Sequence, residues 1–191
     1  MVTRSTKLAM LVGAASAALA LSTGMPASAY PPGQALTLTA SSTQVLKATT
    51  ITVNIRQAKP GIVTVKFGTT VKRTVASSTY KTPSILFKPS AAGVYIVNAK
   101  ALDGEQATTR VYVPSRTIAT AARVGTVTNA VIRYAKPGSL VKVSVGSEDY
   151  YGTVGSAGTA VVPFALENLG QQYVKVTVGT LVMPDASIIG R

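Results

Sequence analysis

Short segments in which apolar and polar residues alternate run along the chain from residue 36 onward. In segment 51–56 every second residue is apolar, beginning with Ile51, and polar residues lie between them. Segment 63–67 repeats the pattern, with Val63, Val65 and Phe67 as its apolar positions. A period of two predicts a strand with one buried face. Clusters of Gly, Pro and Ser separate the segments and helical periodicity is almost absent, so the chain is predicted to be all-β.

Two series of strands follow one another in the same order. The first series is predicted at residues 36–40, 51–56, 63–67, 71–75, 84–88, 94–101 and 108–113. The second is predicted at residues 117–122, 126–134, 140–145, 150–154, 159–164 and 173–178, with a weak last strand near Leu181 or Ile188. About seven short strands in each half, divided by turn residues, predict two β-sandwiches in tandem.

One seven-residue phrase occurs in both halves. IRQAKPG, Ile55–Gly61, returns as IRYAKPG at Ile132–Gly138. Pro sets φ for the first central position of a turn and Gly supplies positive φ at the second, so Lys-Pro-Gly predicts a type II turn between two strands. A functional loop is the alternative interpretation of AKPG. The residues to which we assign the structural role are Pro60, Gly61, Pro137 and Gly138.

A tyrosine stands near the start of the penultimate strand of the first series, in Gly93-Val94-Tyr95. Gly-x-Tyr in this position resembles the tyrosine corner of bacterial immunoglobulin-like domains. The resemblance implies an immunoglobulin-like sandwich in which the Tyr95 hydroxyl bonds back to the preceding loop. In the second half Tyr173 is in phase with the outward-facing Lys175, so the corner role is assigned to Tyr95 only.

The first 29 residues have the pattern of a secretory signal. Arg4 and Lys7 precede an apolar run at residues 8–21, and Ala27-Ser28-Ala29 is an A-x-A cleavage site. We expect cleavage after Ala29 and a secreted chain that stays extracellular or associates with the cell surface. The apolar run is short for a spanning helix and is expected to be removed with the signal, so no integral membrane segment is expected in the mature chain. The alanine-rich signal resembles those of Gram-positive actinobacteria.

Three segments of the chain follow from these patterns. We expect a signal peptide at residues 1–29, a first immunoglobulin-like sandwich at 30–115 and a second at 116–191, joined by a short linker at 114–116. Because the chain contains no cysteine, each sandwich must be stabilised by its apolar core rather than by disulfides.

The mature chain is strongly basic, with 17 basic against 6 acidic residues. Residues 30–115 hold 10 basic and 2 acidic residues, so most of the charge lies in the first half. An excess of this size favours polyanionic partners, which outside a cell include wall polymers and acidic polysaccharides. When the sequence is phased onto the immunoglobulin-like strand order, an outward sheet face in each half carries basic and aromatic residues. The candidate binding residues are Lys66, Lys100, Arg110, Tyr112, Lys142, Tyr173 and Lys175.

Catalytic chemistry has little support in the sequence. The chain contains no histidine and no cysteine, so a general base would have to be one of six scattered carboxylates or a lysine. Glu148 and Asp149 are adjacent in a predicted hairpin, where neighbouring side chains point apart. We therefore expect no enzyme, no cofactor and no metal. A calcium site at Asp103 and Glu105 remains an alternative, and so does a glycan-stacking role for Tyr150 and Tyr151.

These observations predict a secreted, non-enzymatic immunoglobulin-like protein that binds at the cell envelope through basic sheet faces. The expected partner is a polyanionic envelope polymer or a protein, and nucleic acid is not expected. The alternative is a structural subunit that self-associates through exposed strand edges into an extracellular fibre or surface layer. The lysines have a structural interpretation as well, because charged side chains on sheets keep strand edges from pairing.

Overall fold

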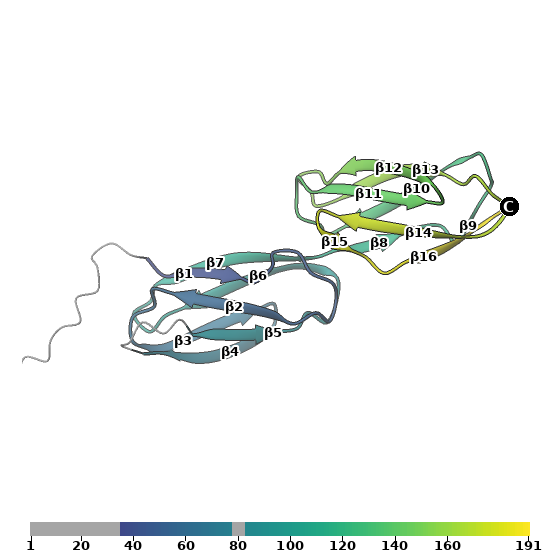
Figure 1. Cartoon of the computed structure of the whole chain (residues 1–191). Helices are drawn as coiled ribbons and strands as arrows, with labels where there is room; N and C mark the ends of the chain where they lie inside the picture. The colour runs from purple at the N-terminus through teal and green to yellow at the C-terminus, as the bar shows by residue number, and fades with distance from the viewer. Residues whose placement is uncertain (1–34, 78–82) are drawn as a thin grey trace, which may run out of the picture. The chain divides into compact units, whose positions relative to one another are not determined.

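The computed structural model describes residues 35–77 and 83–191, and these residues form strands and connecting loops (Figure 1). Within these ranges there is no helix of the length and apolarity needed to cross a membrane. The predicted signal peptide, residues 1–29, and its cleavage site after Ala29 lie outside the described residues. The all-β prediction is confirmed.

The first sandwich is made of two antiparallel sheets. Its strands are β1 (Thr37–Ala40), β2 (Ile51–Arg56), β3 (Gly61–Phe67), β4 (Thr70–Ala76), β5 (Ser84–Phe87), β6 (Gly93–Lys100) and β7 (Gln106–Val113). One sheet has the order β1-β2-β5 and the other β4-β3-β6-β7. This is an immunoglobulin-like arrangement in which β4 pairs with β3 rather than with β5.

The second sandwich repeats this topology. Its strands are β8 (Ser115–Thr117), β9 (Ala121–Ala122), β10 (Val127–Arg133), β11 (Leu140–Val145), β12 (Glu148–Thr153), β13 (Ala160–Ala165), β14 (Gly170–Val178), β15 (Leu181–Val182) and β16 (Ala186–Gly190). One sheet has the order β13-β10-β8 and the other β12-β11-β14-β16-β9, with β15 paired to β14. The prediction of two immunoglobulin-like sandwiches is confirmed.

The predicted strand at residues 117–122 is wrong in its extent. The segment divides into β8, which pairs with β10, and β9, which pairs in parallel with β16 of the opposite sheet. The chain changes sheets between them, so one continuous strand cannot form. Ser115 and Arg116 of the predicted linker already belong to β8, and the weak last strand is two strands, β15 and β16.

Each sandwich has its own apolar core. In the first, the Phe67 ring lies between the rings of Phe87 and Tyr95, with centroid separations of 5.0 and 4.6 Å. In the second, Phe164 is 1% exposed and its ring centroid lies 6.2 Å from that of Tyr150. Two separate cores are consistent with two domains, and the boundaries 30–115 and 116–191 stay a prediction.

The two AKPG phrases adopt different backbone geometries. In the second copy Gly138 has a φ of 80° and the Ser139 amide donates to the Lys136 carbonyl at 3.1 Å, as in a type II turn. In the first copy Gly61 has a φ of 140° and is the first residue of β3, paired with Ala76. The predicted type II turn is therefore wrong for the first copy, because pairing with β4 extends back as far as the glycine.

Tyr95 lies near the start of β6 with its side chain half-buried. Its hydroxyl donates to the Ala91 carbonyl at 2.9 Å and lies 3.3 Å from the Ala91 amide, which donates to it. The hydroxyl thus binds the loop just before β6, and the ring stacks on Phe67. These are the contacts that a tyrosine corner makes.

The segment before β2 contacts the second core as well as β7. The Gln44 side-chain amide donates to the Val178 carbonyl at 2.7 Å, and its oxygen accepts from the Lys136 amide at 2.9 Å. Leu46 packs against the second core. The backbone of the same segment is bonded to Tyr112 of β7. Gln44 therefore satisfies two backbone groups that lie near the ends of strands in the second sandwich.

Candidate functional site

The outward face of the four-stranded sheet β4-β3-β6-β7 carries a cluster of cations. The strand register places Thr64 opposite both Arg73 and Lys100, and Lys66 opposite Val71 and Asn98. Lys66 is thus a diagonal neighbour of Arg73 on one side and of Lys100 on the other. Diagonal pairs in antiparallel sheets are about 7–8 Å apart. We define the basic face by its four exposed cations, which are Lys66, Arg73, Lys100 and Arg110.

Arg110 and Tyr112 complete this surface on the edge strand β7. Arg110 is opposite Ile96, and Tyr112 is opposite Val94. Tyr112 is half-buried, and its backbone amide and carbonyl bond to Thr43 and Val45 on the side away from β6. Tyr112 therefore contributes part of its ring to the face while its backbone closes the sheet edge.

All four residues predicted for the first half lie on this one face, namely Lys66, Lys100, Arg110 and Tyr112. Arg73 was missed, because the alternation Val71, Arg73, Val75 would place valines inward. The structure has this set outward, and Val71 and Val75 are 54% and 68% exposed. Lys72 takes the inward phase instead, where it donates to the Leu86 carbonyl and lies 5.2 Å from the Phe87 ring centroid.

A shallow hollow lies beside Lys66 on the basic face. It has a volume of about 490 Å³ and is lined by Lys66, Gly68, Val94, Tyr95, Ile96 and Asn98. The hollow forms where Gly68 leaves no side chain next to the Tyr95 ring. Its lining combines one ammonium group, one amide, a tyrosine ring and aliphatic surface, a combination suited to an anionic group carried on a hydrocarbon or sugar backbone.

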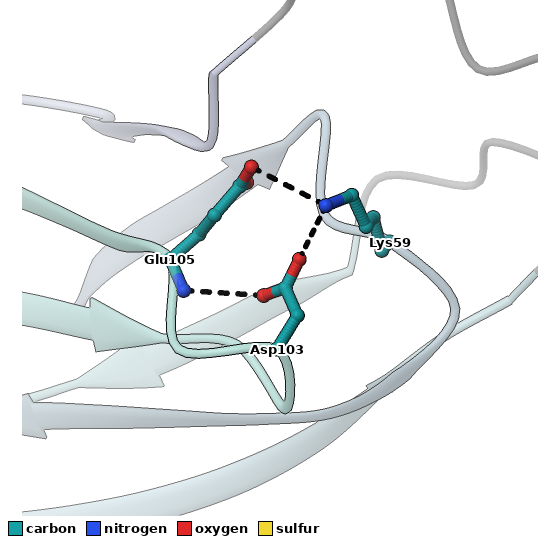
Figure 2. A network of polar contacts seen from close by, with 3 residues as sticks. All are labelled: Lys59, Asp103 and Glu105. Atoms are coloured by element: carbon teal, nitrogen blue, oxygen red, sulfur yellow. Dashed lines mark hydrogen bonds and ion pairs between the residues drawn. The ribbon is translucent and has the colours of Figure 1, made fainter.

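The two acidic residues of the first sandwich lie in the β6–β7 hairpin, and both bind one lysine. Lys59 Nζ lies 2.7 Å from Asp103 Oδ2 and 3.6 Å from Glu105 Oε1, and the Glu105 amide donates to Asp103 Oδ1 at 3.1 Å (Figure 2). The hydrogen bond between Lys59 and Asp103 lowers the pKa of Asp103 and raises the pKa of Lys59. The ammonium group occupies the space between the carboxylates, so the geometry favours an ion pair over the alternative of a calcium site.

Removing the Lys59 ammonium should change the acid titration of Asp103. We expect Lys59→Gln to raise the pKa of Asp103 toward 3.8, measured by NMR titration of its carboxyl carbon. Because the folded-state pKa lies below the unfolded value, the ion pair stabilises the fold above about pH 4. That stabilisation is lost as the pH falls through the folded-state pKa. Lys47→Gln, an exposed control, should leave the midpoint in place, and an unmoved midpoint in Lys59→Gln would refute the pairing.

In the second sandwich the predicted residues Lys142, Tyr173 and Lys175 also face outward, on β11 and β14. Lys142, however, pairs with Asp149 at 2.6 Å, which raises the pKa of the lysine. Its charge is therefore matched by a carboxylate. This face carries less free positive charge than the basic face of the first sandwich.

The adjacent tyrosines of β12 project to opposite sides. Tyr150 is half-buried against Phe164, and its hydroxyl donates to the Ala165 carbonyl at 3.4 Å. Tyr151 is 57% exposed on the outward face. Glu148 and Asp149 alternate along β12 in the same way, and Asp149 is already bound by Lys142 and Ser144. Two neighbours on one strand do not face each other across a cleft as glycosidase carboxylates do.

Comparisons with known proteins give only distant likenesses. No protein-family model matches the chain, and no curated protein matches it. Among solved structures, invasin, a bacterial integrin-binding protein, is similar at 16% identity and a TM-score of 0.39, over 82% of this chain. This chain spans 39% of the invasin structure.

Two structures of intimin are similar to a comparable degree. A 282-residue C-terminal fragment, in complex with the intimin-binding domain of the translocated intimin receptor, has 13% identity and a TM-score of 0.43 over 80% of this chain and 62% of that one. The D00–D0 domain of intimin has 11% identity and a TM-score of 0.38, over 82% of this chain and 99% of that one. At such values the likeness says nothing about a partner or an activity.

Proposed function

We propose that the protein is a secreted, non-enzymatic binding module that acts at the cell envelope through the basic face of its first sandwich. The observation that carries the proposal is the grouping of Lys66, Arg73, Lys100 and Arg110 on one sheet face. Among the described residues none of these cations has a carboxylate within ion-pairing distance. Lys66 repels its diagonal neighbours Arg73 and Lys100, and a bound anion relieves that repulsion.

The chemistry of the face supports a polyanionic polymer as the partner. Aliphatic side chains are exposed on the same sheet face as the cations, among them Ile62, Val94 and Ile96, which are 49%, 45% and 55% exposed. A polymer that presents anionic groups on a polyol or sugar backbone matches both kinds of surface. A protein with an acidic surface is the other partner that this chemistry fits.

Reversing two charges of the basic face should weaken envelope binding. For Lys66→Glu/Lys100→Glu we expect retention of the mature chain on isolated cell envelopes to weaken by roughly tenfold or more, which corresponds to about 1.4 kcal/mol. Retention of the parent should fall steadily as salt is raised, because exposed charges are screened beyond about 8–10 Å near physiological ionic strength. Purified wall teichoic acid, assayed in parallel, separates a polymer partner from a protein partner.

A matched control keeps the net charge of the double variant and moves the change to another face. Arg56 and Lys88 are exposed on or beside the three-stranded sheet of the same sandwich. Arg56→Glu/Lys88→Glu should therefore bind nearly as well as the parent. Equal loss in the two double variants would mean that only net charge matters. Salt-independent retention would rule out the electrostatic mechanism.

Self-assembly into a fibre is the alternative function, and the strand edges bear on it. The edge strands β4 and β12 each pair with a single neighbour in their sheets. β4 carries Lys72 and Arg73, and β12 carries Glu148 and Asp149. Charged side chains oppose pairing of β4 with β4, or of β12 with β12, between two molecules, so a fibre would have to pair β4 with β12. Concentration-dependent growth in light scattering without any anion would favour the fibre instead.

A further inference from the structure

Two tyrosines are exposed on the outward face of β12, β11 and β14, in the second sandwich. Tyr151 is 57% exposed and Tyr173 is 67% exposed. In contrast, Tyr150 uses its ring in the core and its hydroxyl on the Ala165 carbonyl. Tyr151 and Tyr173 thus present large aromatic surfaces to solvent on one sheet face.

The strand register fixes how these tyrosines lie. Tyr151 is opposite Lys142, which is opposite Thr177 on β14. Tyr173 lies four residues before Thr177 on the same face. Two strand spacings of about 4.8 Å and four residues of about 3.3 Å place the tyrosine Cα atoms roughly 16 Å apart. The two rings therefore lie diagonally across three strands.

A row of polar side chains crosses the sheet between the two tyrosines. It consists of Asp149, Ser144 and Lys175, which are opposite one another on β12, β11 and β14. Asp149 Oδ1 accepts from Ser144 Oγ at 2.7 Å, and Asp149 Oδ2 lies 2.6 Å from Lys142 Nζ. Lys142 and then Ser144 are the main causes that lower the pKa of Asp149, with a smaller contribution from the Tyr151 hydroxyl.

This arrangement differs from the basic face in charge as well as in aromatic content. The charges of Lys142 and Asp149 are matched, so Lys175 supplies the only unmatched charge among the residues just described on this face. The donors and acceptors of the network are held in place before any ligand arrives, which lowers the entropy cost of binding. A ligand with many hydroxyl groups and little charge fits such a surface better than a polyanion does.

We propose that this face is a binding site for an extended, neutral oligosaccharide of flat pyranose rings. The C–H faces of separate sugar rings stack on Tyr151 and Tyr173, because aromatic faces suit apolar ring surfaces. The sugar hydroxyls between these rings bond to Asp149, Ser144 and Lys175, directly or through water. The site is separate from the basic face and does not depend on it.

NMR titration of the mature chain with cellohexaose, and separately with chitohexaose, tests this site. We expect saturable amide shifts confined to β11, β12 and β14 with at least one of the two probes. Tyr151→Ala and Tyr173→Ala should each weaken binding by about fivefold to tenfold, whereas Tyr151→Phe, which keeps the ring, should bind nearly as the parent does. Because both tyrosines are exposed, the melting midpoints of the variants should match that of the parent.

Two controls separate this site from other surfaces. Tyr134 is 44% exposed in the loop after β10, so Tyr134→Ala should leave oligosaccharide binding unchanged. Lys66→Glu/Lys100→Glu should also bind the oligosaccharide normally, and raised salt should have little effect. The absence of saturable shifts with both probes, or parent-like affinity in both alanine variants, would overturn the proposal without touching the function proposed for the basic face.

Discussion

Replacing Phe67 by alanine is expected to lower the free energy of unfolding of the first sandwich by about 3–5 kcal/mol. The side chain is 4% exposed, and its ring stacks on both Phe87 and Tyr95. Truncation removes its apolar burial, leaves a cavity between the two sheets and takes away two ring contacts at once. Urea unfolding followed by tyrosine fluorescence and circular dichroism gives the change directly.

Phe164→Ala is the matched variant in the second sandwich. Phe164 is 1% exposed and has one ring contact, with Tyr150. We expect a loss of similar size that appears in the unfolding of the second sandwich. If each variant shifts a different transition, the sandwiches are separate domains, as the boundaries 30–115 and 116–191 predict. A loss below about 1 kcal/mol for Phe67→Ala would contradict the packing described here.

Gly190→Ala is expected to destabilise the second sandwich by about 1–3 kcal/mol or more. A Cβ at this position would lie 3.1 Å from Val124 Cγ2, which is a tight contact. It would overlap the backbone carbonyl oxygen of Asn168, which is a clash. Gly190 is buried and pairs with Gly170 on one side and Ala122 on the other. Because the nearest clashing atom belongs to the backbone of Asn168, no rotamer change can relieve the overlap, and pairing on both sides holds β16 in place.

Gly155→Ala is the control for this substitution. Its Cβ would meet the Thr159 carbonyl at 3.5 Å, an ordinary contact, and its φ lies outside the left-handed region. We expect a change within about 0.5 kcal/mol, measured by thermal unfolding of both variants under the same conditions. Equal melting midpoints for Gly190→Ala and Gly155→Ala would show that β16 does not approach Asn168 this closely.

Much of the fold follows from the alternation of residues. Ile51, Val53 and Ile55 are buried as the pattern predicts, and Lys66 and Lys100 face outward. The phase of such strands is fixed because one face must be removed from water. Edge strand β4 does not follow the pattern, since Lys72 takes the inward phase and donates to the Leu86 carbonyl. Val71 and Val75 face solvent instead. Alternation therefore missed Arg73.

Contacts between distant parts of the chain could not be read from the sequence. Lys59 meets Asp103 because β3 and β6 are neighbours, and the sequence offers no local signal for that ion pair. Likewise, Tyr151 and Tyr173 come to one face only through the registers of three strands. The prediction of a type II turn at Gly61 is wrong for a similar reason, because pairing with Ala76 decides where β3 begins.

The confinement of Asp103 and Glu105 beside Lys59 has a kinetic consequence. Because Lys59 binds both described acids of the first sandwich, the four cations of the basic face keep their charges unmatched by a carboxylate. A negatively charged surface would turn the molecule during diffusion so that this face arrives first. The rate of productive encounter, and not only the lifetime of the complex, would then fall as salt is raised.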